Sequence, residues 1–77
     1  MEVFVLNKIS VCVDITRVIG VYSTKQKTID AVILYYRENE DLEDEDEINK
    51  IRNSLINGDE FYEHEDNYWV ISKMTIQ

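Results

Sequence analysis

The residues of this sequence that could do chemistry are its carboxylates, and they are concentrated in one stretch. Between Glu38 and Asp66 there are thirteen acidic residues against only Lys50 and Arg52, a net charge of −11. The remaining residues include three acids and six bases, a net charge of +3, so the whole chain carries −8. Because a negative surface repels nucleic acid and anionic membranes, this asymmetry argues against direct binding to either and favours a basic partner.

The acidic residues fall into two rows, which we expect to approximate the two phosphate tracks of duplex DNA. Carboxylates at i and i+4 of a helix lie roughly 6 Å apart, and alternate carboxylates of a strand lie about 6.7 Å apart. Duplex DNA carries one charge per roughly 1.7 Å of its axis. We therefore expect these side chains to bind a basic partner, with a tyrosine beside them as an aromatic anchor. The expected binding residues are Glu38, Glu40, Asp41, Glu43, Asp44, Glu45, Asp46 and Glu47 in the first row, and Asp59, Glu60, Tyr62, Glu63, Glu65 and Asp66 in the second.

Other interpretations of the acidic stretch stay open. One interpretation is a DNA mimic, in which the carboxylates take the places of phosphates. A solvated segment that only keeps the chain in solution explains the acidic stretch about equally well. A calcium-binding EF-hand loop is a weaker alternative, because Asp41 to Glu47 lacks the glycine and the register that such a loop needs. Tyr62 and Tyr68 flank the acidic turn, and packing within a sheet would explain them as well as partner binding does.

No constellation of residues indicates an enzyme. The serines have no convincing base and no Gly-x-Ser-x-Gly setting, and there is no glycine-rich phosphate loop. His64 is the single histidine, too few for a structural zinc site. Cys12 is the single cysteine, which excludes an internal disulfide and fits a reducing compartment; with no cation near it, we expect a packed, unreactive thiol. We expect no catalytic residues, no metal and no cofactor.

The length of 77 residues predicts a single domain over residues 1–77, with an acidic insert at about 38–58. A chain this short buries only roughly 60% of its unfolded surface, so it commonly needs a disulfide, a metal or a partner subunit. The single cysteine rules out the disulfide and the single histidine disfavours the metal, so we expect a partner subunit. No apolar stretch approaches the roughly 18 residues that span a membrane, and the N-terminus lacks the features of a signal peptide. We expect a cytoplasmic protein.

The hydrophobic pattern predicts an α+β fold of ββααββ order, a small antiparallel sheet with helices on one face. Alternating β-branched residues predict strands over residues 3–9 and 11–22, paired as a hairpin with a turn near residues 8–14. Strands over 61–64 and 68–76, joined by a turn at 65–67, close the chain.

Between the two pairs of strands we expect two helices. The first begins with Ser23 as N-cap and Gln26 completing a capping box, and it runs to about Asn39. The second is capped by Asp44 or Asp46 and ends at Asn57-Gly58. Their apolar stripes are Ile29, Val32, Ile33 and Tyr36 in the first helix and Ile48, Ile51 and Leu55 in the second.

The first two strands are apolar on both faces, and helices on one side of the sheet cover only one of them. We expect one of two sets of apolar side chains to be exposed on the uncovered face. A contiguous apolar patch of this kind is rare on a monomer, so we expect a homodimer, unless the strands curl and bury both faces within one chain. The two sets are Phe4 and Leu6 with Cys12, Val18 and Tyr22, or Val3, Val5, Ile15 and Ile19.

Two resemblances add to this interpretation. The run from Arg17 to Thr24 (RVIGVYST), followed by a helix that carries Ala31, resembles a signature of small bacterial and phage domains of unknown function, and Phe61-Tyr62 resembles the start of their C-terminal part. The acidic insert and second helix, 38–58, depart from that pattern. In size, acidity and residue usage the chain also resembles phage host-takeover proteins, namely the acidic DNA mimics that block the histone-like nucleoid protein HU. That second resemblance implies an HU-type basic DNA-binding protein as the favoured partner, and it assigns no residue a role.

Overall fold

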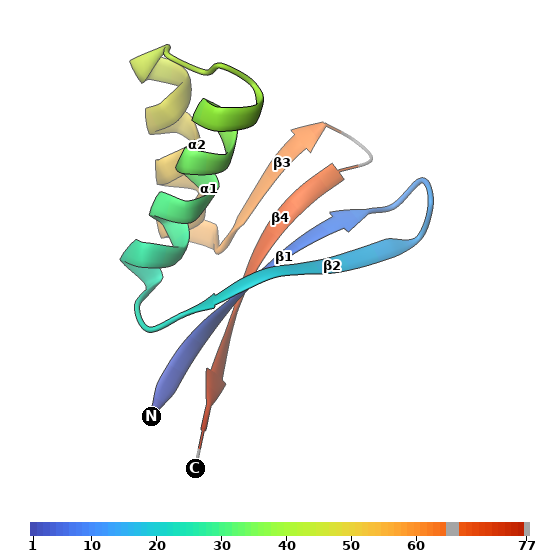
Figure 1. Cartoon of the computed structure of the whole chain (residues 1–77), viewed down its shortest axis with the longest axis vertical. Coiled ribbons are helices and arrows are strands. Elements are labelled where there is room, and N and C mark those ends of the chain that lie inside the picture. The colour runs from blue at the N-terminus through green and yellow to red at the C-terminus, as the bar shows by residue number, and fades with distance from the viewer. Residues whose placement is uncertain (65–66, 77) are drawn as a thin grey trace.

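A four-stranded antiparallel sheet, covered on one face by two helices, makes up the fold (Figure 1). This computed structural model describes residues 1–64 and 67–76. The predicted α+β class and ββααββ order are confirmed, and the strands lie in the order β2-β1-β4-β3. The elements are β1 (Glu2–Ser10), β2 (Ile15–Tyr22), α1 (Lys25–Asn39), α2 (Glu45–Gly58), β3 (Glu60–His64) and β4 (Asn67–Thr75).

The ends of the two helices are set by side chains that satisfy free backbone groups. Thr24 is the N-cap of α1 and accepts a hydrogen bond from the backbone N–H of Lys27, so the prediction that Ser23 caps this helix was wrong. The Ser23 hydroxyl instead accepts from the ammonium of Lys27. Asp44 caps α2, as predicted, and Asp59 ends it in the left-handed conformation with φ 57°.

The core lies between the helical layer and the central strands. The predicted stripes of both helices are buried, and they pack on Leu6 of β1 and on Trp69 and Ile71 of β4. Burial of apolar side chains is the main source of stability in such a small layer. Phe4, Tyr22 and Phe61 extend this core at its margins. Tyr22 also lies across Gly20, where a Cβ would come within 2.6 Å of the tyrosine oxygen.

A β-bulge in the hairpin decides which residues of β2 face the helices. Leu6 pairs with Gly20 but Asn7 pairs with Val18, so Ile19 is the extra residue. Cross-strand partners share a face, so β2 presents Tyr22, Gly20, Arg17 and Ile15 on the helix side. Each predicted uncovered set was therefore wrong in part. Phe4, Leu6 and Tyr22 of the first set pack against the core under the helices, and Ile15 of the second faces the helix side, whereas Val18 of the first set and Val3 and Val5 of the second lie on the uncovered face.

The hairpin turn holds the cysteine. The turn occupies residues 11–14, with Asp14 at φ 51°. Cys12 is exposed there, so the expectation of a packed thiol was wrong. The predicted turn at 65–67 falls mainly outside the described residues, and Asn67 already belongs to β4.

A buried polar chain joins the helical layer to the sheet. The indole N–H of Trp69 donates to the hydroxyl of Tyr36 over 2.8 Å, and that hydroxyl donates to Glu63 Oε1 over 3.1 Å. The other carboxylate oxygen of Glu63 lies 3.9 Å from the Lys8 ammonium. Burial, together with the neighbouring Glu63, raises the pKa of Tyr36 far above its ordinary value, although the Trp69 hydrogen bond works against this. The hydroxyl therefore stays protonated and keeps donating to Glu63.

Replacing Tyr36 by phenylalanine tests this polar chain. The change leaves the buried Trp69 N–H without its acceptor, so we expect the free energy of unfolding to fall by about 1–3 kcal/mol. Tyr62→Phe removes an exposed hydroxyl and should change it by less than about 0.5 kcal/mol. Urea unfolding followed by tryptophan fluorescence measures both, and equal effects of the two variants would contradict the role given to Tyr36.

Candidate functional site

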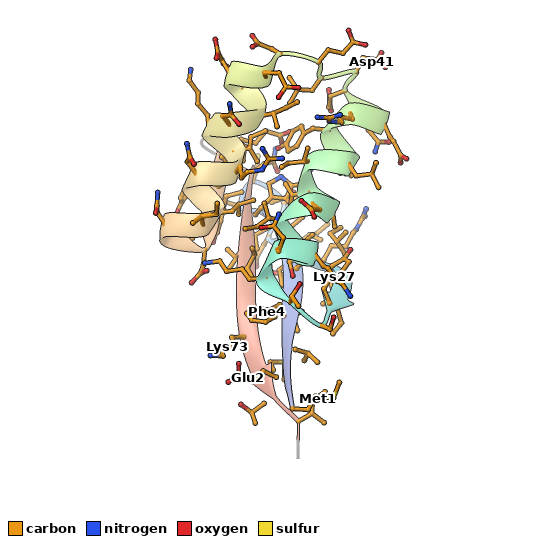
Figure 2. All side chains as sticks on the ribbon, turned by 90° about the vertical axis from the view of Figure 1, so that its left-hand side faces the viewer. Met1, Glu2, Phe4, Lys27, Asp41 and Lys73 are labelled. Atoms are coloured by element: carbon orange, nitrogen blue, oxygen red, sulfur yellow. The ribbon has the colours of Figure 1, made fainter. Side chains whose placement is uncertain are left out.

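The first acidic row forms one exposed surface at the junction of the two helices. We name this surface the acidic end. Figure 2 places Asp41 at one extreme of the helical layer, whereas Glu2 and Lys73 lie at the opposite extreme of the molecule. All its carboxylates are exposed to solvent. Its residues are Glu38 and Glu40 from the end of α1, Asp41, Glu43 and Asp44 from the connection, and Glu45, Asp46 and Glu47 from the first turn of α2.

Few of these charges are neutralised within the chain. Arg37 lies 3.7 Å from Glu45, and Lys50 lies 3.4 Å from Glu47, both as exposed pairs. The other six of the eight carboxylates have no basic partner among residues 1–64 and 67–76. Exposed pairs contribute little to stability and leave most of the field intact. The acidic end is therefore a strongly negative surface, most of whose carboxylates are free to interact with positively charged groups of another molecule.

Local backbone requirements explain part of this acidity. Asp44 accepts from the backbone N–H of Asp46 over 2.9 Å, and the three acids that follow occupy the first turn of α2, where the helix dipole favours negative charge. Asp41 takes a left-handed conformation with φ 49°. Neither requirement applies to Glu38, Glu40 or Glu43. Glu38 is even unfavourably placed, since it lies near the negative end of the α1 dipole.

The second acidic row does not continue the first. Asp59 and Glu60 lie at the opposite end of α2, and the Asp59 carboxylate pairs with Lys25. Glu60 binds the hydroxyl of Tyr62, which raises the pKa of that tyrosine. The side chain of Glu63 points toward α1 and accepts a hydrogen bond from the Tyr36 hydroxyl. Glu65 and Asp66 lie outside the described residues. Of the predicted binding residues that the structure describes, only those of the acidic end are therefore brought together in one continuous surface.

The other exposed feature is the face of the sheet that the helices leave uncovered. We name it the open face. Its apolar side chains range from buried, at Val3, to largely exposed, at Val18, Val21, Tyr62 and Met74. Tyr62 stacks on Tyr68 with ring centroids 4.8 Å apart. Glu60 is its one charged residue among those the structure describes. The open face comprises Val3, Val5, Asn7, Ile9, Thr16, Val18, Val21, Glu60, Tyr62, Tyr68, Val70, Ser72 and Met74.

Sequence reasoning missed one further feature. Lys8 and Arg17 are direct cross-strand partners, and their side chains enter a hollow between the hairpin and α1. The signal was present in the alternation of the two strands. To predict that Lys8 and Arg17 face each other, one must know the position of the four-residue turn, because a shift of one residue in register moves a side chain to the other face.

Comparisons with known proteins give no family for this chain: no family model, no curated protein and no solved structure matches it. In the described part of the chain, no group of three or more histidine, cysteine or acidic side chains is placed to hold a metal ion. None of the helices described is both long enough and apolar enough to cross a membrane.

Substitution of Asp44 separates the structural acids of the acidic end from the others. Asp44→Ala removes the N-cap of α2, and we expect the free energy of unfolding to fall by about 1 kcal/mol. The matched change Glu43→Ala removes an exposed carboxylate that caps nothing, and its effect should stay within about 0.5 kcal/mol. Thermal and urea unfolding measure both. A Glu43→Ala variant that is destabilised as much as Asp44→Ala would show that the connection depends on more than the cap.

Proposed function

We propose that this protein is an inhibitory DNA mimic, which occupies the DNA-binding surface of a basic protein and keeps DNA from it. An HU-type nucleoid protein is the favoured partner, and the host cytoplasm or nucleoid is the proposed location. Carboxylates of the acidic end take the places of phosphates against the lysines and arginines of the partner. No catalytic step and no cofactor is needed, since the mechanism is occupancy.

The observation that supports this proposal most is the surplus of unpaired carboxylates at the acidic end. A segment that only kept the chain in solution would need dispersed charge, because mixed and interspersed charges serve solubility. Here the charges are held at the ends of two helices that pack on a common core. Glu38, Glu40 and Glu43 have no structural task that we can identify, and crowding them costs repulsion. Binding of a basic surface relieves that repulsion.

The alternative is an adaptor domain that binds a partner through the open face, with the acidic end only as a solvated surface. The stacked pair of Tyr62 and Tyr68 favours it, since exposed tyrosines are common interface anchors. The two functions differ in salt dependence. Electrostatic binding weakens as ionic strength rises, whereas apolar binding hardly responds.

Competition between this protein and duplex DNA tests the proposal. A fluorescently labelled duplex bound to purified HU-type protein should be displaced as the chain is added, and the affinity of the chain should fall steeply between low and high salt. The chain alone should leave the duplex free. Affinity that does not change with salt, or joint binding of chain and duplex, would contradict mimicry.

Two triple variants of equal charge make the test specific to the acidic end. Asp41→Asn, Glu43→Gln and Asp46→Asn together remove three charges from it, and we expect affinity to fall about tenfold, at roughly 0.5 kcal/mol for each exposed pair lost. Glu2→Gln, Asp14→Asn and Asp30→Asn remove three exposed charges elsewhere and should change it less than threefold. Equal losses would show that net charge alone is sensed.

We also propose that the chain forms a homodimer through the open face. A chain with charge −8 repels its copy least where acids are few, and the open face has exposed valine, methionine and tyrosine with Glu60 as its one acid among the described residues. Burial of apolar surface in a dimer contributes about 25 cal/mol of stabilisation per Å². A chain of this length has a small core and therefore gains from that added stability. A two-fold arrangement is the commonest closure. It would give one particle two acidic ends.

Sedimentation equilibrium at micromolar concentration tests the dimer. We expect about twice the chain mass of 9.2 kDa, and Val18→Lys should shift the population toward the monomer. Leu34→Lys is the matched control, because Leu34 lies on α1, away from the open face, and is 53% exposed against 60% for Val18. A wild-type mass near 9 kDa, or equal dissociation by both variants, would exclude this interface.

A further inference from the structure

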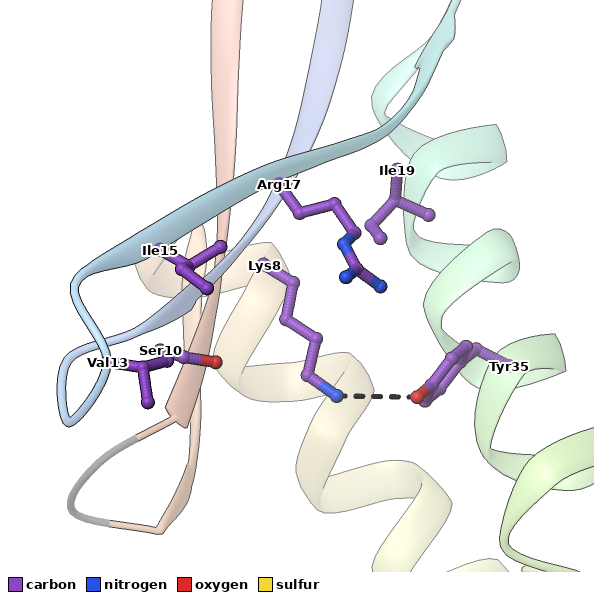
Figure 3. Close-up of a pocket in the computed structure, with 7 residues that line it drawn as sticks. All are labelled: Lys8, Ser10, Val13, Ile15, Arg17, Ile19 and Tyr35. Atoms are coloured by element: carbon purple, nitrogen blue, oxygen red, sulfur yellow. Dashed lines mark hydrogen bonds between the residues drawn. The ribbon is translucent and has the colours of Figure 1, made fainter.

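A hollow of about 280 Å³ opens between the hairpin and α1, on the side of the sheet that the helices cover (Figure 3). Lys8 and Arg17 enter it from β1 and β2, and Tyr35 closes it from α1. Ser10, Ile15 and Ile19 also line it. The hollow thus combines two cations and two hydroxyls with aliphatic side chains, the composition of small-ligand sites.

The two cations repel each other, and only the charge of Lys8 is met by an acid among the described residues. Lys8 and Arg17 are direct partners across β1 and β2, and like charges in such positions destabilise a sheet. The chain has twice as many acids as bases, yet Arg17 has no acceptor among the described residues. Its guanidinium points into the space between Lys8 and Tyr35 (Figure 3). An anion bound between the two cations would remove the repulsion.

Lys8 is held firmly for such a role. Its ammonium donates to the Tyr35 hydroxyl over 3.4 Å and lies about 5 Å from the ring centroids of Tyr35 and Trp69. The Tyr35 hydroxyl accepts this bond, so its own proton is free to be donated. Guanidinium, ammonium and hydroxyl donors therefore converge on one place, with the fork of the guanidinium suited to a two-oxygen acceptor.

The charge balance indicates which anion fits. Lys8 and Arg17 supply two positive charges, and Glu63, 3.9 Å from the Lys8 ammonium, supplies one negative charge. A single negative charge from the ligand brings the site to neutrality, whereas a phosphate dianion would exceed it. Ile15 and Ile19 provide apolar walls next to the cations. From this geometry we infer that the hollow binds a monocarboxylate with a short aliphatic chain, its carboxylate on Arg17 and Lys8 and its chain against the isoleucines.

Titrations of the ¹⁵N-labelled chain at constant ionic strength test this site. Hexanoate should shift the amide signals of residues around the hollow and saturate them. Acetate should bind about tenfold more weakly or worse, since each buried methylene contributes about fourfold in affinity. Hexylammonium, with the same number of carbons and the opposite charge, should leave these signals unmoved. Inorganic phosphate should bind more weakly than hexanoate.

Two arginine variants locate the carboxylate. Arg17→Gln should weaken hexanoate binding at least about tenfold, as expected for loss of a charge-assisted pair of hydrogen bonds. Arg37→Gln removes an equal charge from α1 outside the hollow and should change the affinity less than twofold. Equal binding by the two variants, equal shifts with hexylammonium, or tighter binding of phosphate would each overturn the assignment. The comparison of hexanoate with hexylammonium uses the unaltered chain, so it holds even if Arg17→Gln does not fold.

Discussion

The hydrogen bond from the Trp69 indole to the Tyr36 hydroxyl is the contact that fixes the two layers of this fold to each other. Trp69 is fully buried at the centre of the sheet, and its N–H needs an acceptor there. The hydroxyl of Tyr36, from the last turns of α1, is that acceptor, and it donates a hydrogen bond of its own to Glu63 on β3. One side chain of the helix is thereby bound to both C-terminal strands. The rings of Tyr35, Tyr36, Phe61 and Trp69 meet edge to face around this bond.

Tyr36 also contacts the connection that carries the charges. It holds the C-terminal half of α1 on the sheet, and the backbone N–H groups of Glu40 and Leu42 donate to the carbonyl of Tyr36. The connection that follows has its direction set by those bonds, and Leu42 is half-buried against the core. The acids of the connection can then point only into solvent. The packing at Tyr36 stabilises the end of α1 against the repulsion among these carboxylates. A dense negative surface can therefore lie on folded helix ends.

Local rules made much of this arrangement predictable from the sequence. The apolar stripes of α1 and α2, the cap at Asp44 and the order of the elements follow from spacing within single segments. The faces of the hairpin were not predictable in this way, because the bulge at Ile19 is set by pairing between β1 and β2. The same pairing brings Lys8 to Arg17. The separation of Asp59 and Glu60 from the acidic end, and the inward turn of Glu63, depend on tertiary packing that sequence spacing does not encode.

The acidic end, rather than the open face, is the surface that we propose for the basic partner. The most direct test of this proposal is chemical-shift mapping on the ¹⁵N-labelled chain as unlabelled HU-type protein is added at low salt. We expect the largest changes on the amides of residues 38–47, and we expect them to reverse when duplex DNA is added in excess. Changes concentrated on β2 and β4 at the open face, or changes that excess DNA does not reverse, would contradict it.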